Sequence, residues 1–308
     1  MNSITVKAPA KVNLFLKVLG KRKDSYHNIL TLFERISLTD TIKISKIPKG
    51  ITVKSNRPIT PDAKDNLCFK AAEAVLRRGK VVSGVKIEIK KRIPIESGLS
   101  GGGSDAASTI MGINRLFELR LNDKTLLAIG RKLGADVPFF LLDTQFAIGR
   151  GRGDMLEVVK SKAKFWHLIV KAGYKTATKD IYDSFDRASK RLILRHGSGS
   201  SAELLPKRLT PRSGSAKIHP LLELRMDYAK AESILHNDLE RAVSLKKGVT
   251  GRISRSLAQL LDKRIIISGS GPSLFCLYRT RREAIEARDA VLKSMNALSR
   301  TNWQIFVA

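Results

Sequence analysis

The glycine-rich stretch PIESGLSGGGSDAAS, residues 94–108, constrains the fold of this chain more than any other segment. Glycine allows positive φ angles and close approach of the backbone to a ligand, and successive backbone amides in such a loop bind oxyanions. Alternating apolar residues over 85–93 predict a strand before the loop, and the small residues after it predict a helix over about 105–119. With Ser104 as its N-cap, the helix start would add partial positive charge. The stretch therefore predicts a phosphate-binding loop.

A flexible linker, a Walker A loop and a dinucleotide-binding loop are alternative explanations of this stretch. A linker has a similar composition, but this stretch stands between a well-patterned strand and a helix. Walker A requires Gly-Lys followed by Ser or Thr, which is missing here. Gly101, Gly103 and Ala106 match the dinucleotide pattern GxGxxA, but the strand before them alternates apolar and polar residues. A dinucleotide-binding first strand is normally apolar on both faces, so this explanation is weak.

The bulk composition indicates a globular protein with two domains. The chain has 308 residues, 43% of them hydrophobic, and we expect domains at 1–160 and 161–308. Cys68 and Cys276 lie in separate apolar segments without metal-ligand spacing, so we expect no disulfide and no metal-binding side chains. No stretch approaches the roughly 20 apolar residues of a membrane span, and the start lacks a signal-peptide pattern. We therefore expect a cytoplasmic protein with no membrane partner.

The charge of the chain is strongly positive. Lys and Arg number 57 against 28 Asp and Glu, a net charge of +29, which favours attraction to phosphates and nucleic acids. The basic residues are scattered through the chain, and aromatic residues make up only 6% of it. We therefore expect the charge to steer an anionic substrate and expect no specific nucleic acid partner, although a nucleic-acid-binding protein remains an alternative.

Local patterns in the first half predict further elements around the loop. Strand-like segments on either side of a proline-containing turn predict a hairpin over 41–54. Asp65 or Asn66 is expected to cap a helix that ends at Gly79, and a second helix is expected over 122–133. Residues 145–159, with GRGRGD in the middle, predict another hairpin.

The second half predicts helices laid on an antiparallel sheet, an α+β arrangement. The expected strands lie at 165–171, 264–268, 274–278 and 303–307. Residues 197–216 are rich in Ser, Gly, Pro and basic side chains without periodicity, which predicts a flexible surface insertion. The segment GSGPS, between two apolar strands, predicts either a tight hairpin or a second loop that shapes an active site.

Four polar residues are candidates for chemistry. Lys11 lies among apolar strand residues, where a lysine is usually solvated but a functional role stays open. Many aspartates placed like Asp136, before a proline, only form turns. This one enters an apolar segment, where a carboxylate is partly desolvated and available as a base. Tyr26 and His27 form either an anchored turn or a pair that stacks on and hydrogen-bonds a base.

Three segments resemble, in order, the three motifs of the GHMP kinase superfamily: PAKVNLFLKV, PIESGLSGGGSDAAS and SGSGPSLF. Together they cover nearly the whole chain. Finer features resemble one branch of the superfamily, the 4-diphosphocytidyl-2-C-methyl-D-erythritol kinases. These features are KVNLFLKVLGKRKDSYH, GADVPFF and NDLE, and the Tyr-His pair is the most discriminating of them.

The resemblance implies a two-domain α+β GHMP kinase fold with a left-handed βαβ crossover in the N-terminal domain and a ferredoxin-like C-terminal domain. It implies an ATP-dependent kinase that uses Mg²⁺ and phosphorylates the 2-hydroxyl of 4-diphosphocytidyl-2-C-methyl-D-erythritol, in non-mevalonate isoprenoid precursor biosynthesis. The partner would be a small molecule that carries a cytidine diphosphate group. The nearest alternative is another GHMP kinase, of the homoserine or mevalonate type.

The resemblance also implies roles for individual residues. Asp136 corresponds to the base that accepts or orients the proton of the substrate hydroxyl, and Lys11 to the lysine that stabilises charge on the transferring phosphoryl group. The implied ATP-binding residues are Pro94, Gly98, Leu99, Ser100, Gly101, Gly102, Gly103, Ser104 and Asn66. The implied substrate-binding residues are Asn13, Tyr26, His27, Thr178 and Tyr182, with the cytosine between the two tyrosines.

Two segments depart from the family pattern. The pattern GLGGGSSDAA is GLSGGGSDAA here, so that Ser100 replaces a glycine and Gly103 replaces the first serine. Either Ser100 or Ser104 would then make any contact that the missing serine makes with phosphate or magnesium. Ser25 replaces the glycine of the pattern DGYH. If that position requires positive φ, the serine costs roughly 1 kcal/mol unless the turn adjusts.

Overall fold

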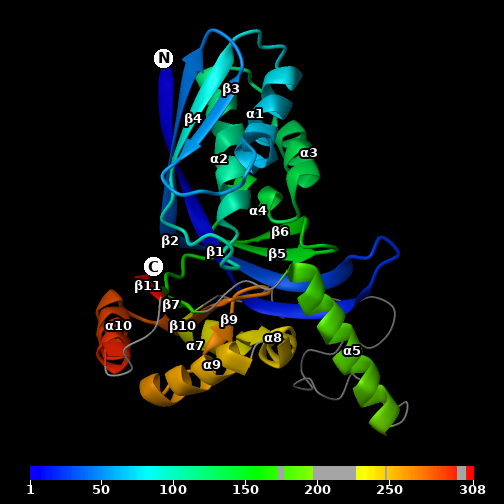
Figure 1. The fold of residues 1–308 in the computed structure, drawn as a ribbon, viewed down its shortest axis with the longest axis vertical. Coiled ribbons are helices and arrows are strands. Elements are labelled where there is room, and N and C mark those ends of the chain that lie inside the picture. The colour runs from blue at the N-terminus through cyan, green and yellow to red at the C-terminus, as the bar shows by residue number, and fades with distance from the viewer. Residues whose placement is uncertain (173–176, 197–226, 247, 297–302) are drawn as a thin grey trace.

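The computed structural model describes residues 1–172, 177–196, 227–246, 248–296 and 303–308, and the insertion predicted at 197–216 lies outside them. Two sheets organise the described chain, one above the other in Figure 1. The upper sheet is formed mostly by the N-terminal half, and the lower one by the C-terminal half.

The upper sheet is built around two long antiparallel strands, β1 (Ser3–Lys21) and β2 (His27–Ile47). Its strand order is β3-β4-β2-β1-β8, and the hairpin β5-β6 pairs with β2. The remaining strands are β3 (Ile51–Ser55), β4 (Gly84–Lys90), β5 (Phe146–Arg150), β6 (Met155–Val159) and β8 (His236–Asn237). The hairpin predicted over 145–159 is therefore confirmed.

The hairpin predicted over 41–54 is wrong. β3 does not pair with β2, because β4 lies between them and pairs antiparallel with β2 and parallel with β3. The parallel pairing requires a crossover, which the helix α1 (Leu67–Arg78) provides after a short 3₁₀ turn, η1 (Ala63–Asp65). The βαβ unit implied by the family resemblance is thus β3-α1-β4.

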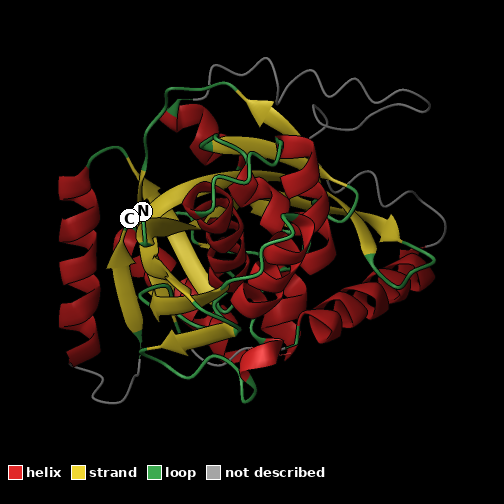
Figure 2. Ribbon diagram, turned by 90° about the horizontal axis from the view of Figure 1, so that it is seen from above, coloured by secondary structure: helices red, strands yellow, loops and turns green. Residues whose placement is uncertain are grey.

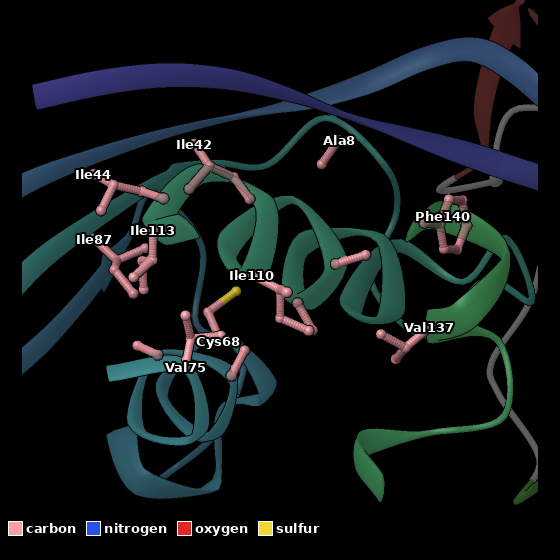
Figure 3. Packing of buried hydrophobic residues seen from close by; sticks show 14 of the residues in the cluster. Ala8, Ile42, Ile44, Cys68, Val75, Ile87, Ile110, Ile113, Val137 and Phe140 are labelled. Carbon is pink, nitrogen blue, oxygen red and sulfur yellow. The ribbon is translucent and has the colours of Figure 1, made fainter. Parts of the chain in front are cut away.

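Four helices cover one face of this sheet: α1, α2 (Gly101–Leu116), α3 (Asp123–Leu133) and α4 (Val137–Leu141). Figure 3 shows α2 between β2, which contributes Ile42 and Ile44, and α1, which contributes Val75. α2 is buried along most of its length because its side chains are small or aliphatic. The body of the helix therefore packs on the sheet from Ser104 onward, and its first three residues stay partly exposed.

The caps of α1 and α3 follow the sequence prediction. Asn66 Oδ1 accepts a hydrogen bond from the amide of Cys68, and Gly79 follows the last residue of α1. Asn122 caps α3 in the same way, and Gly134 follows its end. Polar side chains that accept from the first free amides stabilise a helix by about 1 kcal/mol.

The β1-β2 pairing is interrupted where the candidate residues lie. The register shifts between Pro9 and Lys11 and again between Asn13 and Phe15. Such bulges redirect side chains and are common next to active sites. They explain how Lys11 and Asn13 leave the regular pattern and become buried polar groups within an apolar strand.

The lower sheet has the order β11-β7-β10-β9, with every pairing antiparallel. Its strands are β7 (Trp166–Lys171), β9 (Ile266–Ile267), β10 (Ser273–Tyr278) and β11 (Gln304–Val307). Numbered in chain order within this sheet, they run 4-1-3-2 with helices in both crossovers, which is the ferredoxin-like arrangement. The implied C-terminal fold is therefore confirmed.

The helices of this half are α5 (Thr178–His196), α7 (Tyr228–Ile234), α8 (Glu240–Lys246), α9 (Gly248–Leu261) and α10 (Arg281–Asn296). Figure 1 and Figure 2 place α5 and α10 at opposite ends of this layer. Thr280 and Glu283 form the predicted capping box of α10. None of the helices in the described ranges is long and apolar enough to cross a membrane.

The two halves share one hydrophobic core. It joins residues of β1 and β2, such as Val12 and Leu32, to Ile169 of β7 and Phe275 of β10. β8 also adds residues of the C-terminal half to β1. Because the packing is continuous between the two halves, the domain boundary expected at residue 160 stays a prediction.

Candidate active site

A cavity of about 890 Å³ lies where distant parts of the chain meet. The predicted residues that line it are Lys11, Asn13, Tyr26, His27, Pro94, Gly98, Ser100, Gly101, Gly102, Gly103, Asp136, Thr178 and Tyr182. Three predicted residues do not line it: Leu99 and Ser104 are fully buried, and the Asn66 side chain caps α1. One cavity therefore contains most of the residues predicted to bind the phosphates, the reacting hydroxyl and the base.

The glycine-rich loop brings the start of α2 to this cavity. α2 begins at Gly101, earlier than predicted, so that three glycines form its first turn although glycine is a poor helix former. The predicted N-cap is wrong: Ser100 occupies the cap position with φ 57°, and Ser104 lies buried in the first turn. The first amides of a helix have no intrahelical partner, so Gly101, Gly102 and Gly103 present anion-binding groups to the cavity.

The loop between β9 and β10 packs directly against the glycine-rich loop. Gly98 has φ +80°, and its carbonyl oxygen accepts a hydrogen bond from Ser268 Oγ at 3.1 Å. The amide of Ser273 donates to the carbonyl of Ser97 at 3.0 Å. Asn237 Nδ2 donates to the carbonyls of Ile267 and Gly269 at 2.7 and 2.8 Å, which fixes the second loop. The segment GSGPS therefore connects two strands and also lines the cavity, through Gly269, Ser270 and Gly271.

Lys11 and Asp136 face each other in the cavity. Lys11 Nζ lies 3.7 Å from Asp136 Oδ2 and donates a hydrogen bond to Asn13 Oδ1 at 2.7 Å. Asn13 Nδ2 in turn donates to Thr31 Oγ1, whose hydroxyl donates to the carbonyl of Phe15. This chain of buried hydrogen bonds sets the direction of the ammonium group.

Asp136 is held from two sides. Ser100 Oγ donates to Asp136 Oδ2 at 2.6 Å. Asp136 also precedes α4, and Arg35 Nη2 donates to the carbonyl of Leu142 at the other end of that helix, at 2.5 Å. Arg35 is mostly buried, and burial lowers its pKa. The carboxylate itself is thus held by Ser100 of the glycine-rich loop, while Arg35 holds the far end of the helix that follows it.

A buried ion network lies beneath the start of α2. Lys91 Nζ, at the end of β4, donates to Asp40 Oδ2 of β2 and, at 2.7 Å, to Asp105 Oδ2 of α2. Burial raises the pKa of Asp105 to about 7, against the lowering influence of Lys91. Asp40 Oδ1 accepts the amides of Arg92 and Ile93. The network joins two strands to the helix that presents the anion-binding amides.

The other end of the cavity carries rings. The Tyr26 ring is 55% exposed, and the Arg152 guanidinium lies 5.1 Å from its centre. His27 is buried, with Nε2 2.9 Å from Asp186 Oδ1. Tyr182 stacks on His27 with ring centres 4.6 Å apart, and burial raises its pKa. The predicted placement of a base between Tyr26 and Tyr182 stays a prediction.

Two smaller predictions concern the rim of the cavity. Thr178 Oγ1 lies 3.1 Å from Ser270 Oγ, so the start of α5 contacts the second loop. Ser25 has φ 66°, the positive value that the glycine of the family pattern would favour. The serine therefore carries the strain of roughly 1 kcal/mol expected for that conformation.

The described residues contain no cluster of three or more His, Cys, Asp or Glu side chains that could hold a metal ion. Mg²⁺ bound with a nucleotide usually takes only one or two protein ligands and otherwise uses phosphate and water oxygens. Asp136 and Ser100, which both line the cavity, fit that limited role, whereas Ser104 is fully buried outside the lining.

A family model described as the GHMP kinases N-terminal domain matches residues 66–144, which contain the glycine-rich loop and Asp136. The 4-diphosphocytidyl-2-C-methyl-D-erythritol kinase of Pelobacter propionicus is 35% identical to this chain over 94% of both lengths. That of Acetivibrio thermocellus is 32% identical, over 100% of this chain and 99% of its own. The chain belongs to the 4-diphosphocytidyl-2-C-methyl-D-erythritol kinase family.

Solved structures agree with this membership. The crystal structure of a 4-(cytidine 5'-diphospho)-2C-methyl-D-erythritol kinase has a TM-score of 0.73 and 27% identity, covering 99% of this chain and 98% of its own. A homoserine kinase from Cytophaga hutchinsonii shares the fold, with a TM-score of 0.68 at 20% identity and coverage of 100% and 95%. The predicted GHMP kinase fold is therefore confirmed.

Several residues in or next to the cavity of this 4-diphosphocytidyl-2-C-methyl-D-erythritol kinase family member were not predicted from the sequence. Asn237 lies in the segment NDLE and Arg152 in GRGRGD, so both had a motif that could have pointed to them. Lys91, Asp40 and Asp186 lie in segments without such a signal, and only the folded chain brings them together with the loop and with His27.

Proposed function

We propose that this chain transfers the γ-phosphoryl group of ATP to the 2-hydroxyl of 4-diphosphocytidyl-2-C-methyl-D-erythritol. The observation that carries the proposal is the Lys11–Asp136 pair beside the start of α2, in a cavity whose other end holds Tyr26 and His27. Anion-binding amides, a carboxylate next to a cation, and a base-binding pair match the three parts of this reaction. The names of the relatives support the same activity.

Phosphoryl transfer depends mainly on positioning and electrostatic stabilisation. In the proposed mechanism the amides of Gly101 to Gly103 and the dipole of α2 hold the ATP phosphates. Asp136 accepts the proton of the attacking hydroxyl, and the oxygen attacks the γ-phosphorus as the bond to ADP breaks. Lys11 lies close enough to Asp136 to neutralise charge on the hydroxyl oxygen and on the transferring group.

Magnesium enters this proposal with ATP, where it supplies further neutralisation of the phosphate charge. The protein residues that would contact it are Asp136 and the hydroxyl of Ser100, because Ser104, the other serine at the start of α2, does not line the cavity. The net charge of +29 favours the approach of both anionic substrates.

The cytosine end of the substrate would bind at the rings. Tyr26 offers an exposed face for stacking, and the His27 imidazole, whose Nε2 is engaged by Asp186, keeps Nδ1 for the base. Tyr182 stacks on the His27 ring and so limits its movement. Asn13, which orients Lys11, would contact the methylerythritol end.

The test is ADP release with the cytidine substrate and with a panel of other alcohols that includes homoserine and mevalonate. We expect ADP release with the cytidine substrate and with no other alcohol of the panel, and we expect free CDP to compete with that substrate. Release with homoserine or mevalonate but not with the cytidine substrate would contradict the proposal and favour another GHMP activity.

A further inference from the structure

The Ser100 hydroxyl and the Lys11 ammonium approach the same oxygen of Asp136. Ser100 Oγ lies 2.6 Å from Oδ2 and Lys11 Nζ lies 3.7 Å from it. Because both groups hold Oδ2, the carboxylate can rotate little, and its plane is set by the contact with the glycine-rich loop. Oδ1 is then the oxygen that is left for a substrate hydroxyl.

Ser100 makes this contact from a strained backbone. Its φ of 57° and ψ of 33° lie in the left-handed region, where glycine is favoured and serine is not. Strained residues persist at functional sites when their side chains are needed there. The hydroxyl contact with Asp136 gives a physical reason for a serine at this position.

Gly103 faces the same small space. A Cβ atom at Gly103 would come 3.1 Å from Ser100 Oγ and 3.8 Å from Asp136 Cβ. A side chain at position 103 would therefore crowd the Ser100 hydroxyl and would itself point toward Asp136. The space next to the carboxylate has room for one hydroxyl, from position 100 or from position 103.

We propose that Ser100 is the positioning residue for Asp136 and that Gly103 is kept without a side chain to make room for it. The inference deepens the proposed function and rests on it for the role of Asp136. It predicts that positions 100 and 103 are coupled. A serine at either position alone can place a hydroxyl beside Asp136, but serines at both positions would crowd each other.

The test compares kcat and KM for S100G, G103S and the exchange variant S100G/G103S. S100G should lower kcat roughly tenfold or more, the effect of losing one hydrogen bond to a charged group, and leave the KM for ATP nearly unchanged. G103S should also lower kcat, because its side chain displaces the Ser100 hydroxyl. The exchange variant should recover most of the lost kcat.

A purely structural role for Ser100 predicts different results. S100G also relieves backbone strain, so the control is K80G, since Lys80 has φ 53° and lies outside the cavity. K80G should keep the wild-type kcat. Wild-type kcat for S100G, or an exchange variant no better than S100G, would overturn the proposal.

A measurement without turnover separates this inference from the proposed function. A double-mutant cycle on unfolding free energy with S100A and D136A should show coupling between the two residues, and additive effects would overturn the inference. A wild-type protein that releases no ADP with the cytidine substrate would instead overturn the proposed function, and the cycle would still decide whether Ser100 holds Asp136.

Discussion

Gly98 lies so close to Ser268 that a Cβ atom on Gly98 would come within 2.4 Å of the Ser268 carbonyl oxygen. Position 98 has no room for a side chain, and its φ of +80° disfavours one as well. The glycine-rich loop and the loop between β9 and β10 thus meet backbone to backbone.

Gly98→Ala should push the two loops apart and destabilise the protein by about 2 to 5 kcal/mol, the sum of left-handed strain and overpacking. Gly50→Ala is the matched control, because Gly50 has φ +84° but open space around its Cα. Chemical denaturation of both variants measures the difference. Equal destabilisation of the two would show that the loop contact contributes nothing.

Asp136→Asn should reduce kcat by roughly 10² to 10⁴-fold, because the amide cannot accept the proton of the substrate hydroxyl. ATP affinity, measured by titration, should change little, since the glycine-rich loop remains in place. The control is Asp143→Asn, an exposed carboxylate just beyond α4 that does not line the cavity. Near-normal turnover in Asp136→Asn would remove this residue from the mechanism.

Tyr26→Ala should raise the KM for the cytidine substrate and leave kcat nearly unchanged. Stacking of a base on an aromatic side chain contributes about 1 to 3 kcal/mol, so the expected rise is roughly tenfold to a hundredfold. Tyr26→Phe keeps the ring and its contact with Arg152, and should bind the substrate almost normally. An unchanged KM in Tyr26→Ala would argue against base stacking at this end of the cavity.

Asp105 should make the protein less stable as the pH rises. Burial raises its pKa from 3.8 to about 7, so the folded state binds more protons than the unfolded state between these values. Unfolding free energy should therefore fall from about pH 4 to about pH 7, and the loss should persist above pH 7. Denaturation at pH 5 and pH 8 measures this slope.

Asp105→Asn should flatten that slope, because the amide keeps an oxygen for Lys91 and does not titrate. The exposed Asp143→Asn should keep the wild-type slope. A slope unchanged by Asp105→Asn would assign the pH dependence to other groups.

The parts of the site that could be predicted carry local signals. The glycine-rich loop stands between a patterned strand and a helix, and Asp136 stands between the helix stop at Gly134 and an apolar segment. Lys11 stands among apolar strand residues just after Pro9, where the structure has a bulge between Pro9 and Lys11. The structure brings these residues into one cavity, while their roles stay predictions.

The parts that were missed or wrong depend on contacts between distant segments. β3 pairs with β4 across a helical crossover, so the nearby strand-like residues at 41–45 gave a false hairpin. Lys91 meets Asp40 across 51 positions of the sequence, and His27 meets Asp186 across 159. Ser104 is not the cap because α2 begins at Gly101, and the low helix propensity of the three glycines gave no local signal for that start. A single sequence holds no local trace of such contacts.

The contact between Gly98 and Ser268, 170 positions apart, also has a consequence for synthesis of the protein. A ribosome makes the glycine-rich loop long before the loop between β9 and β10, which contains Ser268. The backbone amide of Val18 likewise bonds to Asp238, 220 positions later in the chain. Contacts of such long range slow folding, because the loop between them must close first. The nascent chain should therefore be unable to complete this cavity until the second loop has left the ribosome, however early the glycine-rich loop is made.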